Sequence, residues 1–410
     1  MLGLLMAVGC APSTSGEAAE ASAPSGSLPP LRSEEAPTTE TTSAPPEAPA
    51  PDRADELLAA MSVEEKVGQL FMPVFFGYDA DDLGPGSRRA NLASFGLETP
   101  AQVVDRYHLG GVIYLQNNIV TADQVGHFSS GLQRAALTNT GIGLLIAVDQ
   151  EGGRVNRLTD GVTVFPPAAV LSGDRDAVRE AGYVTGRQVA MQGINVVLAP
   201  VADVTLDGPS GSINNRSYGD DPAVVSDMVR AAIDGLQSSG VAAAAKHWPG
   251  HGSTDVDSHN LLPVLGMDRD GWDQRDRLPF AAAVDEDVSI VLVGHLALPA
   301  IDPSGAPATV SSVLIDQLLR QEMGFDGVVM TDALNMSAVD DIEPDRLVVE
   351  ALAAGADILL MSEDFPAAYD AVVEAVRSGE LTEDRLDQAV LRVLRLKDDL
   401  GLLPTGAPLR

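Results

Sequence analysis

The sequence of 410 residues predicts a closed (β/α)8 barrel, in a single domain over residues 52–402. Short apolar runs alternate with helix-like stretches, which is typical of a parallel sheet covered by helices. Eight such runs follow one another over roughly 300 residues, as a closed barrel requires. Polar residues stand where these runs end, which in a barrel is one face of the molecule. The main alternative is an open, doubly wound sheet.

The eight predicted strands are continuous apolar runs of the kind that is buried on both faces of a parallel sheet. In chain order they are residues 69–76, 110–115, 143–149, 195–200, 241–247, 288–295, 327–332 and 356–362. Upstream of the first, residues 55–71 (DELLAAMSVEEKVGQLF) carry apolar side chains at helical spacing. A helix therefore leads into the barrel.

The N-terminal residues predict export rather than fold. MLGLLMAVGC (1–10) resembles the end of a bacterial lipoprotein signal, in which Cys10 is lipidated and becomes the mature N-terminus, outside the cytoplasm and anchored to the membrane. It lacks a basic n-region and its apolar run is short, so an ordinary apolar N-terminus stays open, as does a start upstream of Met1. Residues 11–51, rich in Ala, Pro, Ser, Thr and Glu, predict a disordered tether. Residues 403–410 are a tail.

Composition excludes some functions. The formal net charge of −33 argues against nucleic-acid binding through a basic patch. Cys10 is the one cysteine, so the chain has no internal disulfide framework. Beyond the N-terminus no segment approaches the ~20 apolar residues that span a bilayer.

Polar residues cluster at the carboxyl ends of the predicted strands, the face that carries chemistry in a barrel. The set is Asp149, Lys246, His247, His295 and Asp332. Asp332 could instead cap the helix that follows it. In AVDQEGGRVNRL (147–158), glycines allow a tight turn, and the helical offset of Arg157 could aim it back at the pocket or leave it in a surface ion pair. Arg216 lies in the loop NNRSYGDD (214–221).

The stretch KHWPGHGSTDVDSH (246–259) holds three of the six histidines. A metal site is the weaker interpretation, because glycine and proline separate the histidines and no helical HExxH pattern is present. His251, between two glycines, is expected to be a structural turn residue. In an extended segment the side chains of Asp257 and His259 face the same way. The carboxylate can then fix the imidazole tautomer and leave the other nitrogen to move a proton.

Five motifs in this order resemble glycoside hydrolase family 3, in particular its β-N-acetylglucosaminidase branch of bacterial cell-wall turnover. They are AVDQEGGRVNRL, NNRSYGDD, KHWPGHGSTDVDSH, GHLALP and VVMTDALNM, and the resemblance covers roughly residues 53–400. It implies Asp332 as nucleophile and His259 as general acid/base, oriented by Asp257. It implies that the sugar hydroxyls are held by Asp149, Arg157, Arg216, Lys246 and His247.

The resemblance implies retaining, exo-acting hydrolysis of terminal β-linked N-acetylglucosamine from muropeptide or chitin-type oligosaccharides. No metal or cofactor is expected, and a monomer is the default expectation. Family glucosidases take their acid/base from a second domain, and here the chain ends soon after the eighth strand, which favours the loop histidine. Phosphorolysis that yields N-acetylglucosamine 1-phosphate is the nearest alternative. A β-glucosidase or β-xylosidase of the same family and a non-catalytic sugar-binding protein are the others.

Overall fold

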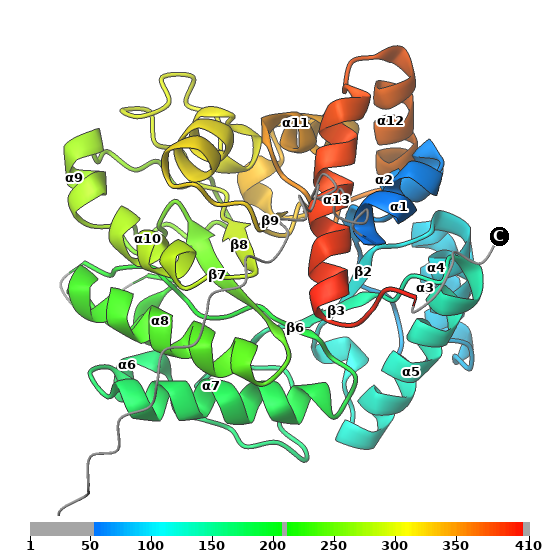
Figure 1. Ribbon diagram of the computed structural model, residues 1–410, viewed down its shortest axis with the longest axis horizontal. Coiled ribbons are helices and arrows are strands. Elements are labelled where there is room, and N and C mark those ends of the chain that lie inside the picture. Colours follow the sequence, from blue (N-terminus) through cyan, green and yellow to red (C-terminus); the bar gives the residue numbers. More distant parts are fainter. Residues whose placement is uncertain (1–52, 207–210, 405–410) are drawn as a thin grey trace, which may run out of the picture. The chain divides into compact units, whose positions relative to one another are not determined.

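All eight predicted strands form in the computed structural model, which describes residues 53–206 and 211–404 (Figure 1). Seven of them are shorter than the apolar runs that predict them, and β7 has the same length as its run but begins and ends one residue later. Their bounds are β1 (Phe71–Met72), β2 (Gly111–Tyr114), β3 (Leu145–Val148), β6 (Val196–Val197), β7 (Ala242–Trp248), β8 (Ile290–Val293), β9 (Val328–Thr331) and β10 (Leu359–Leu360). Cys10, the predicted tether 11–51 and the tail residues 405–410 lie outside the described residues.

The strands are parallel and follow the order of the chain. Six form one sheet in the order β2-β3-β6-β7-β8-β9, and β1 pairs with β10. Backbone bonds continue past both groups: Thr331 N donates to Ile358 O (2.9 Å), and Ile113 N donates to Pro73 O (3.0 Å). The order of the described strands has no reversal of the kind that marks a doubly wound sheet. The fold is therefore a TIM-barrel-like α/β fold with a parallel half-barrel sheet.

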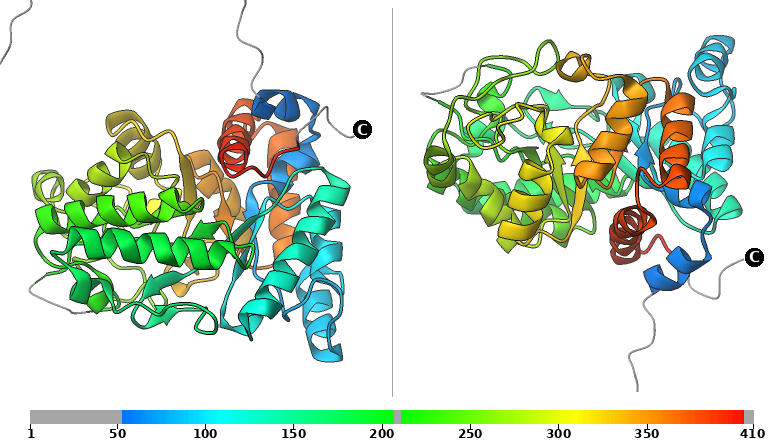
Figure 2. Two further views of the ribbon diagram at one scale, coloured as in Figure 1. Left: turned by 60° about the horizontal axis from the view of Figure 1, so that its bottom comes forward. Right: turned by 90° about the horizontal axis from the view of Figure 1, so that it is seen from above.

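Helices lie outside the strands (Figures 1 and 2). The α-helices are α1 (Arg53–Ala60), α2 (Val63–Gly68), α3 (Pro85–Phe95), α4 (Pro100–Tyr107), α5 (Ala122–Asn139), α6 (Ala168–Leu171), α7 (Arg175–Ala190), α8 (Pro222–Ser238), α9 (Arg269–Gln274), α10 (Arg277–Asp285), α11 (Pro344–Ala354), α12 (Phe365–Ser378) and α13 (Glu383–Asp399). A π-helix, η4, spans Val313–Glu322. Short 3-10 turns are η1 (Gln116–Asn118), η2 (Asn214–Arg216), η3 (Ala308–Val310) and η5 (Ser337–Val339).

Local chemistry sets where these helices begin. The Ser62 hydroxyl accepts from Glu65 N, and the Glu65 carboxylate accepts from Ser62 N, so α2 starts with a capping box. Thr99 and Gln102 do the same for α4. The green helices α7 and α8 pack side by side (Figure 2). In α8 the buried side chains recur every three or four residues, the pattern of a helix with one face on a sheet.

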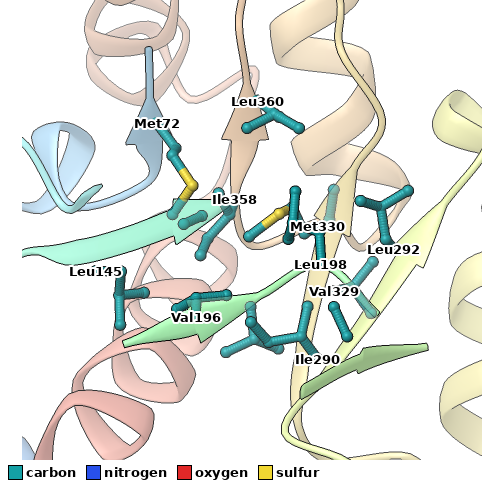
Figure 3. Packing of buried hydrophobic residues seen from close by; sticks show 14 of the residues in the cluster. Met72, Leu145, Val196, Leu198, Ile290, Leu292, Val329, Met330, Ile358 and Leu360 are labelled. Atoms are coloured by element: carbon teal, nitrogen blue, oxygen red, sulfur yellow. The ribbon is translucent and has the colours of Figure 1, made fainter. Parts of the chain in front are cut away.

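The core fills the space between the strands and continues outward between the strands and the helices. Figure 3 shows side chains from strands on different sides of the fold pointing at one another, as in the layered interior of a TIM barrel. Those labelled are Met72, Leu145, Val196, Leu198, Ile290, Leu292, Val329, Met330, Ile358 and Leu360. All are almost fully buried. No helix in the part of the chain that the structure describes is long and apolar enough to cross a membrane.

Two irregularities occur at the carboxyl ends of the strands. After β3 the chain forms an antiparallel hairpin of β4 (Gln150–Gly152) and β5 (Val155–Asn156), with a register shift between Gln150 and Gly152. In β7 the pairing with β8 shifts between Lys246 and Trp248, which is a bulge at His247. Bulges re-aim side chains and are frequent beside active sites.

Candidate active site

A cavity of about 400 Å³ lies at the carboxyl ends of the strands. It brings together seven of the eight residues predicted for catalysis or sugar binding: Asp149, Arg157, Arg216, Lys246, His247, His259 and Asp332. The eighth, Asp257, stands behind His259 and contacts it. Apolar residues such as Ile113, Leu198 and Leu292 form the floor. A volume of this size suits one sugar unit.

Asp332 follows β9 directly, and its position is fixed by the sheet. Its backbone N–H donates to Val293 O (2.8 Å), and its Oδ1 accepts from Ala333 N (2.8 Å). Burial opposes ionisation of this carboxyl, but His247, His295, the Ala333 N–H and Lys246 outweigh it and lower the pKa of Asp332. The side chain therefore faces the cavity as a carboxylate. It does not cap a helix, since the next element is the 3-10 turn η5.

A network of buried charges forms another part of the cavity lining. Lys246 Nζ lies 2.9 Å from Asp149 Oδ1 and 2.6 Å from Glu151 Oε1. Arg157 reaches Asp149 Oδ2 at 3.1 Å, and Arg216 reaches Glu151 Oε1 at 2.7 Å. Three cations thus face two carboxylates, all joined by charge-assisted hydrogen bonds. Hydroxyl groups of a ligand would meet both donors and acceptors here.

The neighbouring cations lower the pKa values of both carboxyl groups in this network. Burial alone would raise the pKa of Asp149, but Lys246 and Arg157 outweigh it and hold that pKa well below its usual range. Burial likewise opposes ionisation of Glu151, yet Lys246 and Arg216 lower its pKa to about 2. The carboxylates in return raise the pKa of Lys246. The network therefore keeps its charges across the physiological pH range.

The β4–β5 hairpin, and not a helix, returns Arg157 to Asp149. The expected helical offset was wrong because Gly152 (φ 97°) and Gly153 (φ 58°) turn the chain back on itself with left-handed backbone. Arg157 N then donates to Asp149 O at 3.3 Å, which seats the guanidinium beside its carboxylate. The same hairpin carries Glu151 into the network.

The bulge in β7 lets two successive residues face the cavity. In a regular strand, Lys246 and His247 would point to opposite faces. With the pairing shifted at His247, both line the cavity, and Trp248 turns into the core, where its ring N–H donates to Leu314 O at 3.0 Å.

The carboxylate of Asp203 orients the imidazole of His247. This carboxylate is fully buried, and its Oδ2 lies 2.8 Å from His247 Nδ1. Its Oδ1 accepts from the backbone N–H groups of His247 (3.2 Å) and His251 (2.7 Å). Because Nδ1 is held by Asp203, Nε2 of His247 faces Arg216, 3.4 Å away. This is the carboxylate support that catalytic and ligand-binding histidines commonly use.

The sequence did not single out Glu151 or Asp203. Glu151 directly follows Asp149 and Gln150, and Asp203 follows the fourth apolar run in LAPVAD. Both are acids at strand ends, the same signal that identified Asp149 and Asp332. Their partners are far along the chain, so the signal alone could not separate them from solvated loop acids.

Asp257 and His259 lie at the rim of the cavity. Asp257 Oδ1 accepts from His259 N (3.0 Å) and lies 2.8 Å from His259 Nδ1. The His259 side chain is 71% exposed, so its other ring nitrogen is reachable from solvent and from the cavity. Partial burial opposes ionisation of Asp257, but the hydrogen bonds from the backbone N–H and the ring of His259, together with electrostatic attraction to that ring, outweigh it and lower the pKa of Asp257. An ionised orienting carboxylate beside an imidazole is a proton-transfer pair.

His251 and His295 are both buried. His251, expected to be a turn residue, lines the cavity and packs edge-on against His247. His295 contacts Thr309 Oγ1 (2.6 Å) and Ala333 O (3.0 Å), so it supports the segment that follows Asp332. Among residues 53–206 and 211–404, no group of three or more His, Cys, Asp or Glu side chains is arranged to hold a metal ion.

The fold is TIM-barrel-like, and its polar side chains gather around a cavity at the carboxyl ends of the strands, the face at which such folds carry their chemistry. Residues 62–396 match the family described as "Glycosyl hydrolase family 3 N terminal domain". The chain therefore belongs to glycosyl hydrolase family 3.

Named relatives agree with this assignment. The chain is 32% identical over 370 residues to β-hexosaminidase A of Pseudoalteromonas piscicida, with 83% of this chain and 62% of that protein covered. It is 35% identical over 334 residues to β-hexosaminidase LpqI of Mycobacterium tuberculosis, with 77% and 83% covered. The solved structure of a family 3 β-N-acetylglucosaminidase from Paenibacillus sp. superimposes with a TM-score of 0.77 at 38% identity, over 85% of this chain and 64% of that one. The chain thus spans less than two thirds of some of these relatives.

Proposed function

We propose that this protein hydrolyses terminal β-linked N-acetylglucosamine from oligosaccharides, with retention of configuration. The observation that carries the proposal is that the Asp332 carboxylate and the His259 imidazole line one cavity whose remaining polar wall is a network of buried charges. Relatives named β-hexosaminidase and β-N-acetylglucosaminidase support the choice of sugar.

The network would hold the distal end of the sugar. Asp149 and Glu151 can accept hydrogen bonds from sugar hydroxyls, and Lys246 and Arg157 can donate to them. Since these groups are already fixed by one another, they need little reorganisation when the sugar binds. An exo-acting enzyme needs such a closed end, because it recognises a terminal unit.

The reaction would take two steps. In the first, His259 donates a proton to the departing glycosidic oxygen as Asp332 attacks the anomeric carbon, which forms a glycosyl ester and breaks the glycosidic bond. In the second, the now neutral His259 takes a proton from water, whose oxygen attacks the anomeric carbon and releases Asp332 as carboxylate. Retaining glycosidases commonly use two carboxyl groups. A neutral imidazole avoids the repulsion that a second carboxylate would suffer beside Asp332.

The test is an assay of p-nitrophenyl N-acetyl-β-glucosaminide against the corresponding glucoside, with and without phosphate. The proposal expects preference for the N-acetylglucosaminide, free N-acetylglucosamine as product and no phosphate requirement. A strict phosphate requirement with a sugar 1-phosphate product would replace hydrolysis by phosphorolysis. A preference for the glucoside would point to a β-glucosidase.

We also propose that the strands close into an eight-stranded barrel. The pairing of β1 with β10, the parallel bridge between Met330 and Ile358, and the bond from Ile113 N to Pro73 O support closure. Such a ring would leave no sheet edge among these strands exposed for aggregation.

The location outside the cytoplasm, anchored through a lipid on Cys10, stays a proposal, as does a monomeric enzyme. The motif MLGLLMAVGC and the polar composition of residues 11–51 support anchoring. Metabolic labelling with an alkyne fatty acid should tag the protein in a bacterial host with a lipoprotein pathway, and Cys10→Ala should remove the tag. Labelling that persists in the variant would contradict this assignment.

A further inference from the structure

His251 occupies a buried position that its turn sequence does not explain. The residue is 2% exposed and lines the cavity. Its backbone N–H donates to Asp203 Oδ1 at 2.7 Å. The flanking glycines are required for this placement: a Cβ on Gly252 would lie 2.1 Å from Val204 O, and Gly250 has a φ of 126°. The backbone is therefore built to bring this imidazole inward.

The imidazole of His251 reaches the loop that carries the proton-transfer pair. Its Nε2 lies 3.2 Å from the hydroxyl oxygen of Ser258, the residue between Asp257 and His259. Ser258 is 3% exposed, whereas the side chains of Asp257 and His259 are 40% and 71% exposed. The segment is a turn and not the extended stretch that the sequence suggested, because Asn260 N and Leu261 N both donate to Asp257 O. This turn places the Ser258 hydroxyl against His251 and leaves the Asp257–His259 pair more exposed.

Resting on the function proposed above, we infer that His251 is a positioning residue for the acid/base pair. Asp203 fixes the backbone of His251, His251 holds the Ser258 hydroxyl, and Ser258 holds the segment that bears Asp257 and His259 at the cavity rim. His259, largely in solvent, has little packing of its own to set its distance from a glycosidic oxygen. Proton transfer requires that distance to be near hydrogen-bond range.

Leaving-group dependence separates positioning from general stability. His251→Ala should lower kcat/KM for the disaccharide N,N′-diacetylchitobiose about tenfold or more, because departure of an alcohol needs a well-placed acid. Activated aryl glycosides need little protonation and should lose much less. Ser258→Ala should give the same pattern, and Ser258→Thr, which keeps the hydroxyl, should restore most of the activity.

A double-mutant cycle tests whether His251 acts through His259. In a His259→Ala background, His251→Ala should cause little further loss, because the group that it positions is gone. Additive losses, or equal losses on activated and unactivated substrates, would overturn the inference and make His251 a core residue.

Hydrogen exchange of the loop amides tests the inference without any measurement of enzyme activity. The amides of Asn260 and Leu261 donate to Asp257 O at 2.9 Å and 3.1 Å. Loss of the His251–Ser258 bond should speed their hydrogen exchange up to about tenfold, the effect of one hydrogen bond. His127→Ala, at a side chain that is 74% exposed on α5, is the control. Unchanged exchange in His251→Ala would refute the inference, whereas an inactive wild-type enzyme with faster loop exchange in the variant would refute only the proposed hydrolysis.

Discussion

Glu151 forms ion pairs with Lys246 and Arg216, two of the cations predicted from the sequence to bind the sugar hydroxyls. Its carboxylate contacts Lys246 and Arg216, and its side chain is 5% exposed. Without it, two cations would be buried with one carboxylate fewer, and Arg216 would lose its carboxylate partner. Removing one member of a buried charge network is costly because the other charges are left uncompensated.

Glu151→Gln should therefore lower kcat/KM on N-acetylglucosaminides by about 10²-fold, since a loss of 2–3 kcal/mol is expected when a charged hydrogen-bond partner is removed. Steady-state kinetics of the purified variant measure this loss. Glu98→Gln is the matched control, because Glu98 is 56% exposed and pairs with Arg88 at 3.6 Å. Equal activity of the two variants would remove Glu151 from the site.

Asp332 carries the sharpest activity prediction. Asp332→Asn should retain the fold and lower kcat on the order of 10⁴-fold or more, because the covalent step is lost. In Asp332→Ala, azide should restore turnover of activated substrates and give the α-glycosyl azide, since it attacks from the side of the missing carboxylate. Activity near wild type in the Asn variant, or a β-azide product, would assign the nucleophile elsewhere.

The residues that sequence reasoning identified are those that end an apolar run or stand in a recognised motif. Asp149, Lys246, His247 and Asp332 all reach the cavity. Side-chain direction was harder to predict. Alternation predicts that only one of Lys246 and His247 faces inward, and the bulge that admits both depends on pairing with β8, which is distant in sequence.

At the scale of elements, Asp357 joins helices to a strand. It precedes β10 and is fully buried, and its carboxylate contacts Arg320 of η4 and Arg385 and Arg392 of α13. Its Oδ2 also accepts from Val329 N of β9 at 2.9 Å. One side chain thus links a π-helix, the last helix and two strands at the end of the fold away from the cavity.

Asp357→Ala should lower the free energy of unfolding by about 3–5 kcal/mol, the cost of leaving buried charges unpaired. Asp326→Ala, which removes an 80% exposed carboxylate that pairs with Arg392, should cost less than about 1 kcal/mol. Urea denaturation of both variants measures the contrast. A similar small cost for both would show that the arginines find other partners.

Element positions were more predictable than element lengths. Each apolar run coincides with one strand to within a residue at its carboxyl end, because continuous apolar segments are those that can be buried on both faces of a parallel sheet. The strands β1, β6 and β10 each span two residues although their runs have six to eight. The β4–β5 hairpin was missed, because its polar sequence QEGGRVN carries no alternation of apolar residues.

At the scale of the whole molecule, Lys397 makes stability depend on pH. The side chain is fully buried in α13 and donates to Gln69 Oε1 at 2.6 Å. Burial lowers the pKa of Lys397 from 10.5 to about 7. Between these two pH values the unfolded chain binds a proton that the folded chain does not. The contribution of Lys397 to stability is therefore fully present above pH 10.5 and is lost as the pH falls towards 7.

Lys397→Met should remove this dependence. Relative to wild type, the variant should gain about 3 kcal/mol in free energy of unfolding between pH 9.5 and pH 6.5, as the linkage relation requires. Urea denaturation across that range tests it. Lys66→Met is the control, since Lys66 has a carboxylate partner, Asp387, at 2.6 Å. If the difference in free energy of unfolding between wild type and Lys397→Met does not change with pH, the buried amine keeps its proton in the folded protein.

The pairing of β1 with β10 has a consequence for biosynthesis. Phe71 pairs with Leu359 and Met72 with Leu360, so the first strand, which has β2 on one side, finds its partner on the other side only after nearly all of the domain has been made. At translation rates of about 5–20 residues per second, that wait is on the order of ten seconds to a minute. During it the nascent chain presents unpaired strand edges and a half-built apolar interior. Ribosome-bound chains stopped before β10 should therefore need a holding chaperone, and release of the last two helices should be the step that frees the protein from it.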